Sequence, residues 1–195
     1  MNFGFDGFAM KKPNIVLISI DTLRADHVSC YGYERKTTPC LDQLAEEGIL
    51  FENSYSTGVW TPPGHGSMLT GLHPCQHGAT GKNRLRKSVP TLAEILQNNG
   101  YRTVGLINNP QVGELVGFDR GHEIFCEVWR GVRARTVIDR GVRFIHRKAL
   151  SALHRLDKGA KKTTDLAIKW LGENAKSGYP FYLFIHFIEP KKARF

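Results

Sequence analysis

Residues 14–20 read NIVLISI, and the polar segment Asp21-Thr22-Leu23-Arg24 follows them directly. An uninterrupted apolar and β-branched run predicts a strand that is buried on both faces, as in a parallel sheet. Ligand sites in open α/β sheets lie beyond the carboxyl ends of the strands. Asp21 has this position and is the first candidate site residue, although an aspartate here can equally be a turn or cap residue.

Strand and helix patterns alternate along the rest of the chain. Short apolar runs predict further strands at 49–55, 101–107 and 181–188. Periodic apolar positions between start and stop residues predict helices at 39–47, 64–70, 90–99 and 163–174. This order predicts an α/β fold with a mainly parallel sheet flanked by helices. Residues 110–130 lack such a pattern and are expected to be rich in loops.

The chain has 195 residues, enough for one domain, and a formal net charge of +9. All of the excess lies between Arg130 and Lys162, where eleven basic residues face two acids. Apolar residues recur there every three or four positions, which predicts a basic amphipathic helix near 138–156. Such a helix either packs on the domain or binds a membrane surface or polyanion. Without a recognised motif, no specific nucleic-acid partner is expected.

Cysteine usage and the N-terminus bear on the compartment. Cys30, Cys40, Cys75 and Cys126 lack C-x-x-C spacing, which argues against a structural zinc site and favours reduced thiols. Residues 1–12 resemble no signal peptide, and no apolar run has the length of a transmembrane span. We expect a flexible N-terminus at 1–12 and a cytoplasmic protein.

Residues 58–71, GVWTPPGHGSMLTG, contain a second candidate site. Two prolines predict a rigid turn, and small residues lead into a helix. The N–H groups and dipole at a helix N-terminus favour a bound oxyanion, and Thr61 would present a hydroxyl there. His65, four residues on, would lie over the same anion. The alternative is that Thr61 only caps the helix or belongs to the turn.

An ordered set of segments resembles the sulfatase-like hydrolases of the alkaline-phosphatase superfamily. They are NIVLISIDTLRADHVSCYGY (14–33), TTPCLDQLAEEGILFENSYS (37–56), TPPGHGSMLTGLHPCQHGATG (61–81), GFDRGHEIFCE (117–127), TTDLAIKWLGEN (163–174) and PFYLFIHFIEP (180–190). The resemblance implies an alkaline-phosphatase-like fold and metal-dependent hydrolysis of a small anionic ester, a sulfate or a phosphate.

The resemblance also assigns roles around Thr61. When the chain is aligned on Met68-Leu69-Thr70-Gly71, Thr61 occupies the position of the cysteine or serine that sulfatases convert to formylglycine, and His65 replaces an arginine. None of the cysteines is followed by x-P-x-R, so no formylglycine is expected. Related phosphodiesterases use a threonine nucleophile, so phosphate and phosphonate esters become candidate substrates.

Other positions depart from the family pattern. Thr22 stands where a second acidic metal ligand is usual, and Ile107-Asn108-Asn109-Pro110 stands in place of Gly-Lys-x-His. Asn108 is the residue expected to donate a hydrogen bond to the anion. Glu189-Pro190-Lys191 replaces Asp-Pro-His, and Lys191 is a further candidate anion ligand.

The implied metal site has Asp21 and Thr61 as ligands of one divalent cation, calcium. A shared cation requires their oxygens to lie within about 5 Å of each other. The family's remaining ligands belong to a later Asp-His or Asp-Asn motif that this sequence lacks. Residues 13–195 are therefore interpreted as the N-terminal part of a truncated catalytic domain, with a complementing C-terminal half as a partner. The alternatives are an inactive fragment and a protein that binds polyanions or membranes through the basic helix.

Overall fold

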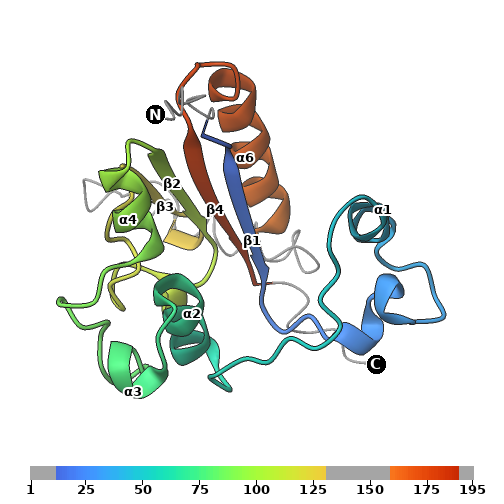
Figure 1. Ribbon diagram of the computed structural model, residues 1–195, viewed down its shortest axis with the longest axis horizontal. Coiled ribbons are helices and arrows are strands. Elements are labelled where there is room, and N and C mark those ends of the chain that lie inside the picture. Colours follow the sequence, from blue (N-terminus) through green and yellow to red (C-terminus); the bar gives the residue numbers. More distant parts are fainter. Residues whose placement is uncertain (1–11, 131–158, 189–195) are drawn as a thin grey trace, which may run out of the picture.

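The computed structural model describes residues 12–130 and 159–188, which form an α/β domain built on a parallel sheet (Figure 1). The strands are β1 (Ile15–Ile20), β2 (Arg102–Ile107), β3 (Ile124–Glu127) and β4 (Phe181–Phe187), in the order β1-β4-β2-β3. Every neighbouring pair is parallel. The predicted basic helix at 138–156, the predicted N-terminus up to residue 11 and Lys191 lie outside the described residues.

Helices cover both faces of this sheet. α6 (Ala160–Asn174) packs Ala167 on one face, against a cluster that includes Leu106 and Leu183. The opposite face carries α2 (Thr61–Thr70), α3 (Pro74–His77) and α4 (Leu92–Asn98). There Leu69 and Ala93 join a core with Tyr182 and Phe184. A parallel sheet with helices on both faces confirms the predicted fold class.

The predicted elements differ from the structure mainly at their ends. α2 begins at Thr61 instead of residue 64, and α6 begins at Ala160 instead of 163. β3 was not predicted, because its four residues are too short to produce a pattern within a loop-rich segment. The remaining short elements are 3₁₀ turns: η1 (Ala25–His27), η2 (Ser29–Tyr31), η3 (Pro110–Val112) and η4 (Val128–Arg130).

Two expectations about apolar runs were wrong. Residues 49–55 form no strand, and Ile49 and Phe51 are 83% and 69% exposed. This segment belongs to the part of the chain that carries α1 (Pro39–Glu47) and lies beside the sheet, where it pairs with no strand (Figure 1). β1 is likewise not buried on both faces: it lies at the sheet edge, and Val16 and Ile18 are exposed.

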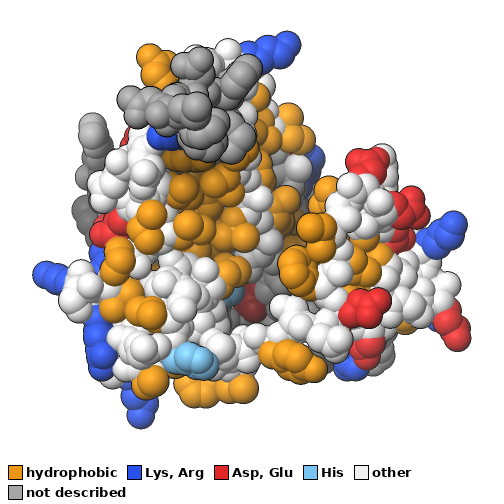
Figure 2. Space-filling model, viewed as in Figure 1, with side chains coloured by type: hydrophobic (Ala, Val, Ile, Leu, Met, Phe, Trp, Pro, Cys, Tyr) orange, Lys and Arg blue, Asp and Glu red, His pale blue; other side chains and the backbone are white. Residues whose placement is uncertain are grey.

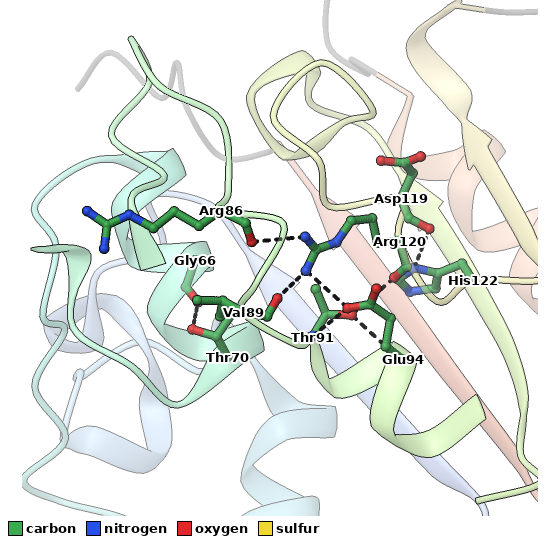
Figure 3. A network of polar contacts seen from close by, with 9 residues as sticks. All are labelled: Gly66, Thr70, Arg86, Val89, Thr91, Glu94, Asp119, Arg120 and His122. Carbon is green, nitrogen blue, oxygen red and sulfur yellow. Dashed lines mark hydrogen bonds and ion pairs between the residues drawn. The ribbon is translucent and has the colours of Figure 1, made fainter. Parts of the chain in front are cut away.

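A polar network fastens the loop before β3 to the start of α4 (Figure 3). Thr91 and Glu94 form a reciprocal capping box at the N-terminus of α4. The Arg120 guanidinium donates to Glu94 Oε2 at 3.0 Å, to the Arg86 carbonyl at 3.0 Å and to the Val89 carbonyl. Residues 86–94 and the loop that carries Arg120, which are distant in sequence, are thereby held together.

No helix in the described ranges is both long and apolar enough to cross a membrane.

Candidate functional site

Three segments meet at the carboxyl end of the sheet and place Asp21, Thr61 and Asn109 together. Thr61 Oγ1 lies 3.4 Å from Asp21 Oδ2, although forty residues separate them. Asn109 Nδ2 donates to the same Asp21 oxygen at 3.0 Å. The separation of the Asp21 and Thr61 oxygens is within the limit of about 5 Å that a shared cation sets.

Strand alternation explains why these side chains face one another. Side chains two residues apart point to the same face of a sheet. Ile15 and Leu17 pack toward the α2 side, and continuing the period places Ser19 and Asp21 on that side too. Ile107 packs there as well, so the same period carries Asn109 to the same face.

Asn108 falls on the other face for the same reason. It follows Leu106, which packs under α6. An added Cβ on Gly159, the N-cap of α6, would come within 2.8 Å of Asn108 Nδ2, so this side chain lies against the start of α6. Asn108 and Asn109 are both about 2% exposed. The predicted site residue Asn108 is therefore buried beside α6, and its neighbour Asn109 is the residue that reaches Asp21.

Asn109 is held in one orientation. Its Oδ1 accepts a hydrogen bond from the Gln111 N–H at 2.9 Å, within the turn η3. The amide NH2 group therefore points to Asp21. Sequence reasoning missed Asn109, although the two-residue period of the preceding strand was enough to separate it from Asn108.

Thr61 does not act as a helix cap. The N-cap of α2 is Trp60, and Thr61 is the first helical residue, with 9% of its surface exposed. Its hydroxyl hydrogen-bonds to Asp21. The alternative in which Thr61 only caps the helix is therefore not the arrangement found.

The N-terminus of α2 offers fewer N–H donors than a helix start ordinarily does. Pro62 and Pro63 have no N–H, and the Gly64 N–H donates to the Trp60 carbonyl at 3.1 Å. Of the first four residues, only Thr61 retains an N–H for an external anion. The anion-binding capacity expected of this helix is correspondingly reduced.

His65 connects α2 with β1. Its Nδ1 lies 2.9 Å from the Thr61 carbonyl, which can only accept, so Nδ1 carries the proton. Nε2 then accepts from the Ser19 hydroxyl at 3.0 Å. Burial lowers the pKa of His65, more than its contacts with the Thr61 carbonyl and Asp21 raise it. The ring is thus neutral at neutral pH and packs 5.0 Å from the His186 ring.

The site can supply part of a cation shell. Asp21 Oδ2 is occupied by the Thr61 and Asn109 donors, and no hydrogen bond to Oδ1 is found among the described residues. Asp21 Oδ1 and Thr61 Oγ1 are the oxygen donors that hard cations prefer. The described ranges contain no group of three or more His, Cys, Asp or Glu residues able to hold a metal. These residues therefore fit two ligand positions of the six or more that calcium takes.

Figure 2 shows how this edge reaches solvent. A hollow opens between α2 and the segment that carries α1, and acidic and histidine atoms are visible at its floor. Trp60, the N-cap of α2, is exposed. An external ester could therefore approach the end of β1 from this side.

Comparisons with known proteins agree on one family. The sulfatase family model matches residues 13–192. N-acetylgalactosamine-6-O-sulfatase from Bacteroides thetaiotaomicron is 32% identical over 114 residues, covering 55% of this chain and 22% of that protein. The chain thus spans about a fifth of the length of such relatives.

Solved structures share the fold. The structure of BT4656 in complex with its substrate D-glucosamine-2-N,6-O-disulfate has a TM-score of 0.67 at 22% identity, covering 92% of this chain and 35% of that one. Phosphonate monoester hydrolase of Agrobacterium radiobacter has a TM-score of 0.67 at 21% identity, covering 93% and 42%.

Proposed function

Because this chain belongs to the sulfatase family, we propose that it carries the nucleophile side of a divalent-metal site that hydrolyses sulfate or phosphate esters. Thr61 would be the nucleophile, and Asp21 and Thr61 would hold the cation. Oxygen donors favour a hard cation such as calcium. The relatives named above act on sulfated sugars and phosphonate monoesters. A threonine at the nucleophile position requires no formylglycine, which keeps phosphate and phosphonate esters beside sulfate esters as substrates.

One observation carries the proposal, the 3.4 Å separation of Thr61 Oγ1 and Asp21 Oδ2. Nothing local in the sequence brings these residues together, and a helix cap would need no aspartate. A cation bound there would polarise the threonine hydroxyl. The hydroxyl already donates to Asp21, so this carboxylate is the nearest acceptor for its proton. Asn109 holds the carboxylate in place.

In the proposed step, Thr61 Oγ1 forms a bond to phosphorus or sulfur, and the ester's P–O or S–O bond breaks. The alcohol leaves with the proton that the hydroxyl releases, and water later releases the inorganic anion. His65 contributes by fixing α2 to β1, because its Nε2 is engaged by Ser19 of β1 while its Nδ1 bonds to the Thr61 carbonyl within α2. We expect slow steady-state turnover by this chain, since the described residues supply only two ligand positions.

A labelling experiment tests the nucleophile without requiring fast turnover. The chain would be incubated with an aryl phosphate and calcium or manganese, and its peptides analysed by mass spectrometry. We expect a phosphoryl group on Thr61, lost in Thr61→Val and Asp21→Asn and retained in Thr61→Ser. Valine keeps the shape of threonine and removes only the hydroxyl.

Thr70→Val is the matched control, because Thr70 lies in the same helix and its hydroxyl donates to the Gly66 carbonyl instead. Labelling of Thr61 in this variant should equal that of the parent chain. A folded chain that is labelled elsewhere, or equally well in Thr61→Val, would refute the assignment of Thr61.

A further inference from the structure

The described part of the candidate site has no positive charge of its own to set against an anionic ester. Both ring nitrogens of His65 are engaged by Thr61 and Ser19, Asn109 is an amide, and two prolines remove N–H donors from the start of α2. Arg24, three residues after Asp21, is paired with Asp26 at 2.5 Å. A monoanionic or dianionic group facing the Asp21 carboxylate needs a cation besides the metal.

The loop after α3 brings a lysine to this place. Trp60 Nε1 donates to the Thr80 carbonyl at 3.3 Å, next to the proposed nucleophile. A Cβ added to Gly81 would lie 3.6 Å from Pro62 Cγ and 3.7 Å from Trp60 Nε1. The loop therefore packs directly on the first turn of α2.

Lys82 stands at the tip of this loop. The Thr80 N–H donates to the Asn83 carbonyl at 3.3 Å, which closes the chain around Gly81 and Lys82. Lys82 Cα consequently lies within roughly 9 Å of the Pro62 ring, given the spacing of consecutive Cα atoms. The flexible four-carbon stem of lysine can span such a gap. Lys82 is exposed and forms no hydrogen bond or ion pair with any described residue.

The surroundings of Lys82 favour anions. Residues 53–93 contain no Asp or Glu. The six positions 82–87 of this segment hold four basic residues: Lys82, Arg84, Arg86 and Lys87. Figure 2 shows basic side chains gathered along the left edge of the molecule, over the connection between α3 and α4. A surface of one sign raises the local concentration of a ligand of the opposite sign.

Four other described cations are engaged or lie on the other face of the sheet. Arg84 donates to the Glu114 carbonyl and Arg86 to the Gln76 carbonyl, each at 2.9 Å. Lys161 pairs with Asp165 on α6. The charge of Lys162 lies near Cys126, which packs under α6 on the opposite face of the sheet.

We infer that Lys82 is a substrate-binding residue. Its ammonium group would contact the anionic group of an ester that is bound at Thr61. This inference rests on the proposed function and names the residue that supplies the positive charge. It assigns this charge to a loop cation, since the ring nitrogens of His65 are already bonded to Thr61 and Ser19 and Asn109 is an uncharged amide.

Anion binding tests the inference separately from catalysis. Inorganic phosphate and inorganic sulfate would be titrated in the presence of calcium, with the backbone amide signals of Thr61 and Gly81 followed by NMR. Lys82→Gln should weaken binding about five- to tenfold, and Lys82→Glu should weaken it further. Lys87→Gln, an exposed lysine of the same segment, is the matched control and should change affinity less than twofold.

Unchanged affinity in both Lys82 variants, or an equal loss in Lys87→Gln, would overturn the inference, because the charge effect would then be absent or diffuse. Labelling of Thr61 in the same preparations separates the two ideas. Labelling without dependence on Lys82 leaves the proposed function standing and removes the inference. Anion binding that depends on Lys82, without labelling, removes the nucleophile role alone.

Discussion

Replacing Gly66 by alanine should destabilise the protein, although alanine is the better helix former. Gly66 lies inside α2, and a Cβ there would come within 2.4 Å of His77 Cε1 and 2.7 Å of its Nδ1. His77 has no exposed surface, so its ring cannot simply swing out into solvent. Either the ring or the helix must move.

The cost follows from the contacts of His77. Nδ1 accepts from the Ala79 N–H at 3.0 Å, so Nε2 carries the proton that faces Ser67 Oγ at 3.1 Å. Overpacking a buried site costs about 1–3 kcal/mol. A buried N–H left without its acceptor costs about 1–3 kcal/mol more. Alanine stabilises the helix by about 1 kcal/mol relative to glycine, because of its higher helix propensity. The expected net loss in the free energy of unfolding is therefore roughly 1–5 kcal/mol.

Urea unfolding followed by far-UV circular dichroism measures this difference. Gly172→Ala is the matched control, since Gly172 lies in helix α6 and a Cβ there meets nothing within 4 Å. That variant should gain up to about 1 kcal/mol. If Gly66→Ala were as stable as the parent chain, the argument that an added Cβ displaces the His77 ring would be wrong.

Burial lowers the pKa of His122 to about 4, from an ordinary value of 6.5. The folded state therefore loses about 3 kcal/mol of its free energy of unfolding as the pH falls from 6.5 toward 4, and loses none of it above pH 6.5. His122→Phe should flatten the pH dependence of the free energy of unfolding over that range. Arg120→Met removes three hydrogen bonds of the network in Figure 3 and should cost about 2–4 kcal/mol in urea unfolding, whereas Arg24→Met, at an exposed pair, should cost nothing measurable. Intact-mass analysis should find no cysteine converted to formylglycine; conversion at Cys75 would contradict the role given to Thr61.

The fold was predictable because its signals are local. The run before Asp21 forms β1, and the run near the end forms β4, within one residue of the predicted bounds. The strand predicted at 49–55 did not form, because an apolar run becomes a strand only beside a neighbouring strand. The sequence does not show which segments will be neighbours. The exposure of Val16 and Ile18 has a related cause, since sheet order alone decides which strand lies at an edge.

The candidate site was predictable in part for a different reason. Motif resemblance selected Asp21 and Thr61, and the structure places their oxygens 3.4 Å apart. The same resemblance selected Asn108 by its place after a strand, without asking which face it occupies. The period of the strand places Asn109 on the Asp21 side and Asn108 under α6.

The departures at His65 and at the two asparagines form one physical pattern. A family arginine and a family lysine are both replaced by groups that carry no charge here, and Pro62 and Pro63 remove backbone donors beside them. The position of Thr61, the proposed nucleophile, survives these changes, because Asp21 bonds to its hydroxyl and Asn109 holds Asp21, and neither contact needs a positive charge. In the proposed function, anion recognition at the described residues is weakened by the same changes, because it depends on charge. On the two proposals made above, the chain separates these tasks: Lys82, on a loop packed against Trp60, supplies the charge for recognition without disturbing the buried contacts around Thr61.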